Sequence, residues 1–156
     1  MKTHFTVINV KMATDLSVMH HINIPYILIS VVSPEYPNYE LAYNDMCKDV
    51  LKLRFHDVDE KGNINSLVET GKIITRIDDK IAQQIIDFSQ KHNDIKNMVI
   101  HCEAGVSRSP GIAMALSEIR NGTEIHPDEY VDTLYDIRHH NVIVKKKILD
   151  VYYEKK

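Results

Sequence analysis

The chain has 156 residues, of which 44% are hydrophobic and 26% charged, and this is the size and composition of one ordinary globular domain. We therefore expect residues 1–156 to form a single domain. The formal net charge of -3 argues against general binding to nucleic acid or to an anionic membrane surface. It leaves room for a small, locally positive site that captures an anion.

The two cysteines, Cys47 and Cys102, are too few for a disulfide framework and indicate a reducing compartment, where a free reactive thiol can exist. Residues 1–10 contain no long apolar core and do not read as a signal peptide. No stretch approaches 18 apolar residues. We expect a cytoplasmic protein without a membrane span. No Cys/His spacing fits zinc, so the sequence predicts no metal site and no cofactor.

Predicted strands dominate the first half of the chain. Three short segments are rich in aliphatic and aromatic residues and predict β-strands: 5–10, 26–32 and 50–55. Cys47 precedes the third of them, in a segment that we expect to be helical. The polar stretch 57–75, which contains Gly62 and Gly71, predicts a loop.

The second half has helical periodicity, interrupted by a short apolar strand at 98–101. The predicted helices begin at capping residues or end at a glycine: from about 78, from 109 to 121, from 127 to at least 137, and over about 142–153. Strands with continuous apolar runs, followed by helices, favour parallel pairing. We predict an α/β fold with a central, largely parallel sheet flanked by helices on both faces.

The segment from His101 to Ser109 lies between a predicted strand and a predicted helix. Backbone N–H groups converge on an anion at such a junction, because the first turn of a helix has unpaired donors. These donors favour the thiolate form of Cys102, and Gly105 lets the loop curl without a steric clash. Arg108 can present a planar fork to two phosphate oxygens. The pattern indicates a nucleophilic cysteine beside an anion site.

This segment resembles the signature of the protein tyrosine phosphatase superfamily, and in particular of its dual-specificity branch. The signature is His-Cys, five residues, Arg and then Ser or Thr, and residues 101–109 read His-Cys-Glu-Ala-Gly-Val-Ser-Arg-Ser. The resemblance covers roughly residues 50–141. It implies a cysteine phosphatase-like fold, with Cys102 as nucleophile, Arg108 as phosphate-binding residue and Ser109 as the helper that breaks down the phosphoenzyme. It also implies a phosphate cradle built by the backbone of Glu103, Ala104, Gly105, Val106, Ser107 and Arg108.

The resemblance further implies a general acid, an aspartate just after the strand that precedes the long helix. Asp57 follows the strand predicted over 50–55 and fits this place. Asp59 and Glu60 are alternatives, and all three can also be read as solvated loop charges. Asn141 is loosely similar to an asparagine that this branch carries before its last helix, although turn chemistry also explains it.

Glu103 is the clue to the substrate, because phosphoinositide-selective relatives usually carry lysines in this loop. The sequence thus predicts a cysteine-dependent phosphatase for phosphotyrosine, and for phosphoserine or phosphothreonine if the site is shallow, with a phosphorylated protein or peptide as partner. One alternative is a non-catalytic phosphoprotein-binding module of the same fold. Another is an arsenate reductase or a sulfurtransferase, although a reductase usually needs additional cysteines.

Other residues keep two interpretations each. His101 either supports the loop or is a hydrogen-bonded core residue. Tyr36, Tyr39 and Tyr43 either line a wall for a substrate ring or are exposed turn residues. Cys47 is either packed or an oxidation partner of Cys102, and the second role requires the two thiols to be close.

Overall fold

The computed structural model describes residues 1–62 and 74–154. Within these residues the strands form one five-stranded sheet with the order β3-β2-β4-β1-β5, and every pair is parallel. The strands are β1 (His4–Asn9), β2 (Tyr26–Val32), β3 (Cys47–Arg54), β4 (Asn97–Cys102) and β5 (Val131–Thr133). The predicted α/β fold with a central parallel sheet is confirmed.

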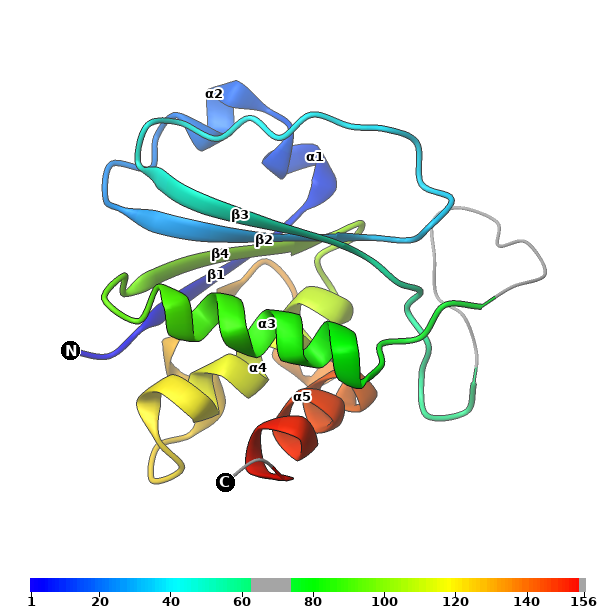
Figure 1. Cartoon of the computed structure of the whole chain (residues 1–156). Helices are drawn as coiled ribbons and strands as arrows, with labels where there is room; N and C mark the ends of the chain where they lie inside the picture. The colour runs from blue at the N-terminus through cyan, green and yellow to red at the C-terminus, as the bar shows by residue number, and fades with distance from the viewer. Residues whose placement is uncertain (63–73, 155–156) are drawn as a thin grey trace.

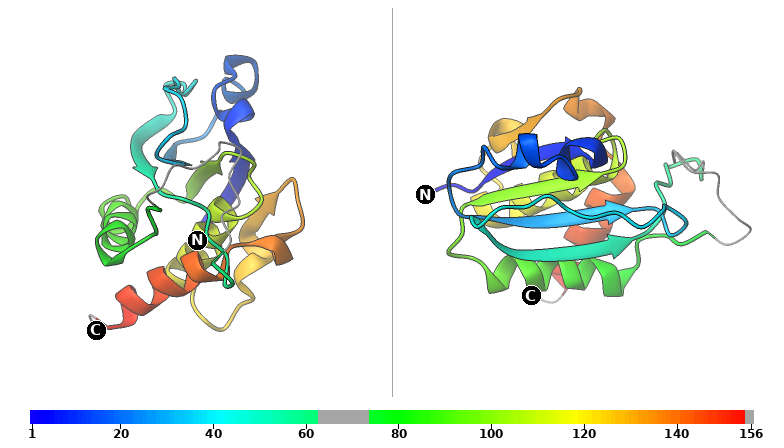
Figure 2. Two further views of the ribbon diagram at one scale, coloured as in Figure 1. Left: turned by 90° about the vertical axis from the view of Figure 1, so that its right-hand side faces the viewer. Right: turned by 90° about the horizontal axis from the view of Figure 1, so that it is seen from above.

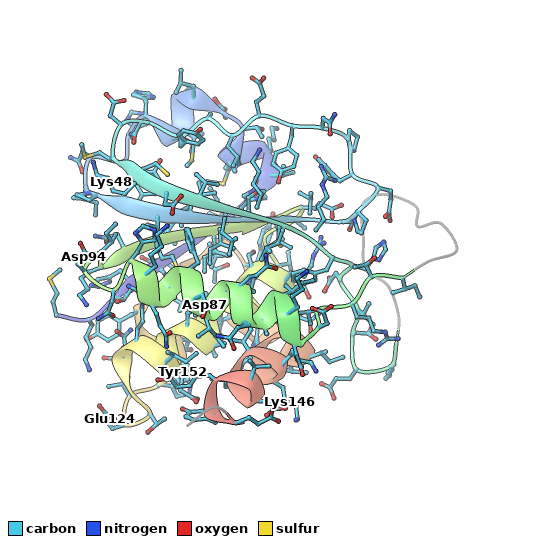
Figure 3. The ribbon with its side chains drawn as sticks, in the orientation of Figure 1. Lys48, Asp87, Asp94, Glu124, Lys146 and Tyr152 are labelled. Atoms are coloured by element: carbon cyan, nitrogen blue, oxygen red, sulfur yellow. The ribbon has the colours of Figure 1, made fainter. Side chains whose placement is uncertain are left out.

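Helices cover both faces of this sheet (Figure 1). On one face lie α1 (Val10–Ala13) and α2 (Leu16–Met19), and on the other α3 (Asp79–Lys91), α4 (Arg108–Asn121) and α5 (Val142–Glu154). The 3-10 helices η1 (Pro127–Tyr130) and η2 (Ile137–His139) flank β5 in the sequence. Figure 2 shows the same layers from two further sides. The outer surfaces of α3 and α5 carry charges such as Asp87 and Lys146, which point into solvent (Figure 3).

The central strand β2 is buried along its whole length, which explains its almost continuous apolar sequence. Its side chains alternate between two cores. Ile27, Ile29 and Val31 pack toward α3, α4 and α5, whereas Tyr26 and Leu28 pack toward α1 and α2.

Helix α4 is buried on nearly all sides from Arg108 to Ser117, because it lies between the sheet and α5. Gly111 permits this close packing, since a Cβ atom there would lie 2.7 Å from the carbonyl oxygen of Asn141. The N-terminal end of α4 is therefore held against the start of α5.

Two sequence predictions about local structure were wrong. The helix expected from Pro127 to at least Ile137 is replaced by η1, β5 and η2, because Val131–Thr133 pairs with the outer edge of β1. Cys47 begins β3 and is not helical, because it pairs with Tyr26 in β2. The strand predicted over 5–10 is present as β1 and ends one residue earlier, at Asn9, whose side chain accepts a hydrogen bond from the N–H of Met12 and caps α1. Most of the loop predicted around Gly62 to Gly71 lies outside the described residues.

Residues 1–62 and 74–154 lack two features that would indicate a membrane or a metal ion as a partner. None of their helices has the length and apolar character needed to span a bilayer. They also contain no group of three or more His, Cys, Asp or Glu side chains arranged to hold a metal ion.

Candidate active site

The polar residues of the candidate site gather where parallel strands end. Cys102 is the last residue of β4, Ser33 directly follows β2, and Phe55 and Asp57 follow β3. The carboxyl ends of parallel strands meet at one edge of a sheet, which is where α/β proteins build their sites. Segments that are far apart in the sequence thereby reach the loop between β4 and α4.

Cys102 is 2% exposed and its sulfur has two polar neighbours. The N–H of Gly105 donates to Sγ at 3.3 Å, and Ser109 Oγ lies 3.1 Å from Sγ. Gly105 has a φ of 75°, and a Cβ atom there would lie 2.9 Å from the carbonyl oxygen of Ile8, so the turn requires glycine. Donors aimed at sulfur stabilise a thiolate, the reactive form of cysteine.

Arg108 is 2% exposed. Its guanidinium donates hydrogen bonds to the residue after β2, to the residue after β3 and to the cysteine loop. Its Nη1 donates to the carbonyl oxygen of Phe55 at 2.7 Å and to Ser33 Oγ at 3.2 Å, and its Nη2 donates to Glu103 at 2.7 Å. The buried Nε–H has no hydrogen-bond partner among the described residues. A buried guanidinium N–H without a partner is costly, and a bound oxyanion would satisfy it.

Glu103 turns its side chain inward and forms a buried ion pair with Arg108. The N–H and hydroxyl of Ser33 donate to the same carboxylate oxygen at 2.8 and 2.7 Å. Burial alone raises the pKa of the Glu103 carboxyl, but the hydrogen bonds from Ser33 and Arg108 outweigh it and leave the pKa lowered. The carboxylate thus points into the protein and orients Arg108.

The rest of the loop is more open. Ala104, Val106 and Ser107 are partly exposed, whereas Cys102 and Gly105 are buried. A ligand that reaches the loop from solvent would first meet these three residues. Their backbone amides lie in the segment for which the resemblance implies a phosphate cradle.

Asp57 lies beside the loop, where the sequence expected the general acid. Its Oδ1 accepts a hydrogen bond of 2.7 Å from Ser107 Oγ and another of 2.7 Å from Asn141 Nδ2. No described residue is hydrogen-bonded to Oδ2. Because Oδ1 is used twice as an acceptor, the proton of a protonated Asp57 belongs on Oδ2, which is free to donate it.

The two rival acids are placed differently. Asp59 accepts a hydrogen bond from the N–H of Lys61 in a turn and is half-buried, and Glu60 is exposed. Both line a groove of about 670 Å³ that runs from Ser107 to residues 138–142. The geometry therefore connects Asp57, more directly than its rivals, to the cysteine loop.

Asn141 joins the loop, the acid and the last helix. Its Oδ1 accepts from the N–H groups of Ile143 and Val144 and caps α5, while its Nδ2 donates to Asp57 and to the carbonyl oxygen of Val58. Its N–H also donates to the carbonyl oxygen of Ser107. Asn141 is thus a turn residue, as turn chemistry predicted, and it also holds Asp57 in place.

Ser33 is the site residue that the sequence did not single out. It contacts both Glu103 and Arg108, although 70 and 75 residues separate it from them. The available signal was its position at the end of a buried strand, since such ends converge in a parallel sheet.

Cys47, by contrast, lies at the opposite end of the sheet from Cys102, so the two thiols cannot form a disulfide in this fold.

His101 and the tyrosines also find definite places. His101 Nε2 is hydrogen-bonded to Ser30 Oγ, which is bonded in turn to the Tyr39 hydroxyl. The Tyr36 ring lies edge-on against Tyr39, and Tyr43 is half-exposed. Tyr39 is therefore not an exposed turn residue.

Comparison with known proteins finds similarity among solved structures. No protein-family model matches the chain, and no curated protein matches it. Among solved structures, the crystal structure of PTPMT1 in complex with PI(5)P is similar, with 16% sequence identity and a TM-score of 0.41 over 97% of this chain and 92% of that chain. A similarity this low establishes neither fold nor activity. The chain is thus defined by its own geometry as an α/β protein with a buried cysteine in a strand–loop–helix junction.

Proposed function

We propose that the chain is a cysteine-dependent phosphatase that hydrolyses phosphate monoesters through a cysteinyl-phosphate intermediate. The observation that carries this proposal is Arg108. Its guanidinium is oriented by three hydrogen bonds, yet its buried Nε–H lacks a partner among the described residues. A phosphate beside Cys102 would supply the missing acceptor and would be held for in-line attack.

The first step transfers the phosphoryl group to sulfur. The Cys102 thiolate attacks phosphorus, the bond from phosphorus to the ester oxygen breaks, and Asp57 gives the leaving oxygen a proton from Oδ2. Arg108 and the loop amides stabilise the negative charge of the equatorial oxygens.

The second step restores the enzyme. Asp57, now ionised, takes a proton from water while the water oxygen attacks phosphorus, and the phosphorus–sulfur bond breaks. Ser109 Oγ, 3.1 Å from Sγ, donates a hydrogen bond to the departing thiolate. Inorganic phosphate then leaves the loop.

The decisive measurement is phosphate release from para-nitrophenyl phosphate with a chelator present, for the native chain, Cys102→Ser and Cys47→Ser. We expect turnover that vanadate blocks, that Cys102→Ser abolishes and that Cys47→Ser retains, because Cys47 lies at the other end of the sheet. Full activity in Cys102→Ser would exclude the mechanism. Phosphopeptide binding without turnover by the reduced native chain would replace it with a binding module.

We further propose a phosphorylated protein as the substrate, with phosphotyrosine as the first residue to test, because residues 101–109 resemble the signature of the dual-specificity branch. The inward orientation of Glu103 removes the argument that its charge excludes lipid phosphates. Phosphotyrosine and phosphothreonine peptides should therefore be compared with phosphoinositide vesicles at equal phosphate concentration. A kcat/KM that is highest for vesicles would overturn the protein substrate and leave the cysteine mechanism intact.

A further inference from the structure

His56 comes directly before Asp57 and is buried, and the mechanism above gives it no role. The residue is 2% exposed. Its Nδ1 lies 2.8 Å from the backbone nitrogen of Thr75, and its Nε2 lies 2.8 and 2.9 Å from the two carboxylate oxygens of Glu35. Its own backbone N–H donates to the Thr75 carbonyl oxygen at 2.7 Å. A buried imidazole is retained at low cost when both ring nitrogens are paired in this way.

The partners of the His56 ring determine which nitrogen carries its proton. A backbone N–H only donates, so Nδ1 accepts the hydrogen bond from Thr75 and carries no proton. The proton of the ring is therefore on Nε2, which donates to the carboxylate of Glu35. A hydrogen bond to a charged acceptor is stronger than one between neutral groups. His56 thus joins two segments that are far apart in the sequence.

Glu35 lies in the turn that follows β2, and this turn is tied to the cysteine loop. Arg54 Nη1 donates to the carbonyl oxygens of Ser33 and Tyr36 at 3.1 and 2.8 Å, and so holds the turn closed. The hydroxyl of Ser33 accepts from Arg108 Nη1 at 3.2 Å. The turn that carries Glu35 is therefore connected to the arginine that we propose to bind phosphate.

We propose that His56 is a positioning residue for Asp57, and that it acts through its hydrogen bonds to Glu35 and Thr75. The two hydrogen bonds to Oδ1 orient the side chain of Asp57, whereas His56 fixes the backbone from which that side chain extends. A general acid must lie within hydrogen-bond distance of the leaving oxygen. A displacement of about 1 Å is enough to lower the rate roughly 10²-fold.

This inference rests on the proposed function and is tested by its dependence on the leaving group. Glu35→Gln removes the charge that receives the Nε2–H, and the Glu35 side chain is 27% exposed, so the variant should fold. We expect kcat/KM to fall about fivefold for phenyl phosphate and less than about twofold for a dinitrophenyl ester, which needs no acid. The inhibition constant of vanadate should not change, because the phosphate loop is intact.

Two substitutions of His56 separate its two hydrogen bonds. The amide of asparagine overlies Nδ1 and can accept from Thr75, whereas the amide of glutamine reaches the position of Nε2 and can donate to Glu35. We expect His56→Asn and His56→Gln each to lower kcat/KM for phenyl phosphate about tenfold, because each loses one bond. His56→Ala loses both and should be lower than either.

A double variant tests whether the effect passes through the acid. Glu35→Gln combined with Asp57→Asn should match Asp57→Asn alone, because His56 acts only through Asp57. Multiplied losses in the double variant would contradict the inference. So would a native ring that carries its proton on Nδ1, which the ring ¹⁵N spectrum of His56 reports without any turnover.

The matched control is Glu40→Gln, a change at an exposed glutamate in the same connection between β2 and β3. It should leave kcat/KM unchanged for both esters. If Glu35→Gln behaves like Glu40→Gln, or lowers kcat/KM equally for both esters, His56 does not position the acid and the phosphatase mechanism stands. A native chain that releases phosphate from neither ester would overturn the proposed function, and this inference with it.

Discussion

Helix α4 has an arginine near each end, and the two differ in what they leave unsatisfied. Arg120, in the last turn, donates from Nε to Ser89 Oγ, from Nη1 to Thr3 Oγ1 and the Ile95 carbonyl oxygen, and from Nη2 to the carbonyl oxygens of Ser89 and His92. Each guanidinium nitrogen of Arg120 therefore donates at least one hydrogen bond. Arg108, in the first turn, is more deeply buried, yet its Nε–H has no partner among the described residues.

On the proposed function, this difference separates an arginine with a structural role from one that binds phosphate. Arg120 satisfies carbonyl groups at the C-terminal end of α3, which that helix cannot pair internally, and so fastens α3 to α4. Arg108 is also held by several hydrogen bonds, but its Nε–H has no partner among the described residues. Burial alone therefore does not distinguish the two arginines, whereas the buried donor without a partner among the described residues does, and the proposed function assigns that donor to a phosphate.

The comparison predicts that Arg→Lys lowers activity at the N-terminal end of α4 and stability at its C-terminal end. The loss of activity is the largest effect that we expect. Arg108→Lys should lower kcat/KM about 10³-fold, because an ammonium group cannot replace the planar fork. Arg120→Lys should change kcat/KM of the folded protein less than twofold and lower the free energy of unfolding by about 2 kcal/mol. Steady-state kinetics and urea titrations measure both, and equal losses of activity would remove the distinction.

Removing the partner of Arg108 should destabilise the protein. Glu103→Gln leaves the buried guanidinium without its counter-charge, so we expect the free energy of unfolding to fall by about 3 kcal/mol. The exposed Glu124 offers a control, since Glu124→Gln should stay within 0.5 kcal/mol of the native chain, roughly the effect of a surface change. Chemical denaturation with matched m-values would test this, and a neutral Glu103→Gln would show that Arg108 does not need the pair.

The general acid can be identified by comparing how its substitution changes kcat for esters with different leaving groups. Asp57→Asn should reduce kcat about 10²-fold for phenyl phosphate, whose leaving oxygen needs a proton, and much less for a dinitrophenyl ester. Asp59→Asn should reduce kcat less than threefold with either ester. The reverse ranking of the two variants would transfer the role to Asp59.

The smallest predicted effect is the dependence of stability on pH through His101. Its folded-state pKa of about 4 lies below its ordinary value of 6.5, so the unfolded chain binds the proton more readily between these values. The contribution of neutral His101 to the free energy of unfolding is fully present above pH 6.5, and it is lost as pH falls toward 4. Between pH 6.5 and 5 we expect a loss of about 2 kcal/mol.

Urea titrations at the two pH values should show a smaller loss in His101→Gln than in the native chain, because glutamine does not titrate. An identical pH dependence in both chains would mean that His101 is not held neutral.

Most of the sheet was predictable because its central strands have distinctive sequences. The apolar run of β2 coincides with the predicted 26–32, and β4 differs from the predicted 98–101 by one residue at each end. Segment 131–133 shows the limit of this approach. It has no strong strand pattern of its own, and it is a strand because the edge of β1 offers hydrogen bonds to it.

The sequence by itself determined the chemistry that one short segment can carry: a cysteine, a glycine that turns the chain and an arginine, between a strand and a helix. Their spacing is local, so tertiary packing is not needed to recognise it. Only the tertiary structure decided the partners. Ser33 and Asp57 reach the segment because parallel strands end at one edge of the sheet, and contacts across 50 or more residues depend on sheet order, which no local pattern encodes. Asn141 reaches the segment because it caps α5, which packs against α4.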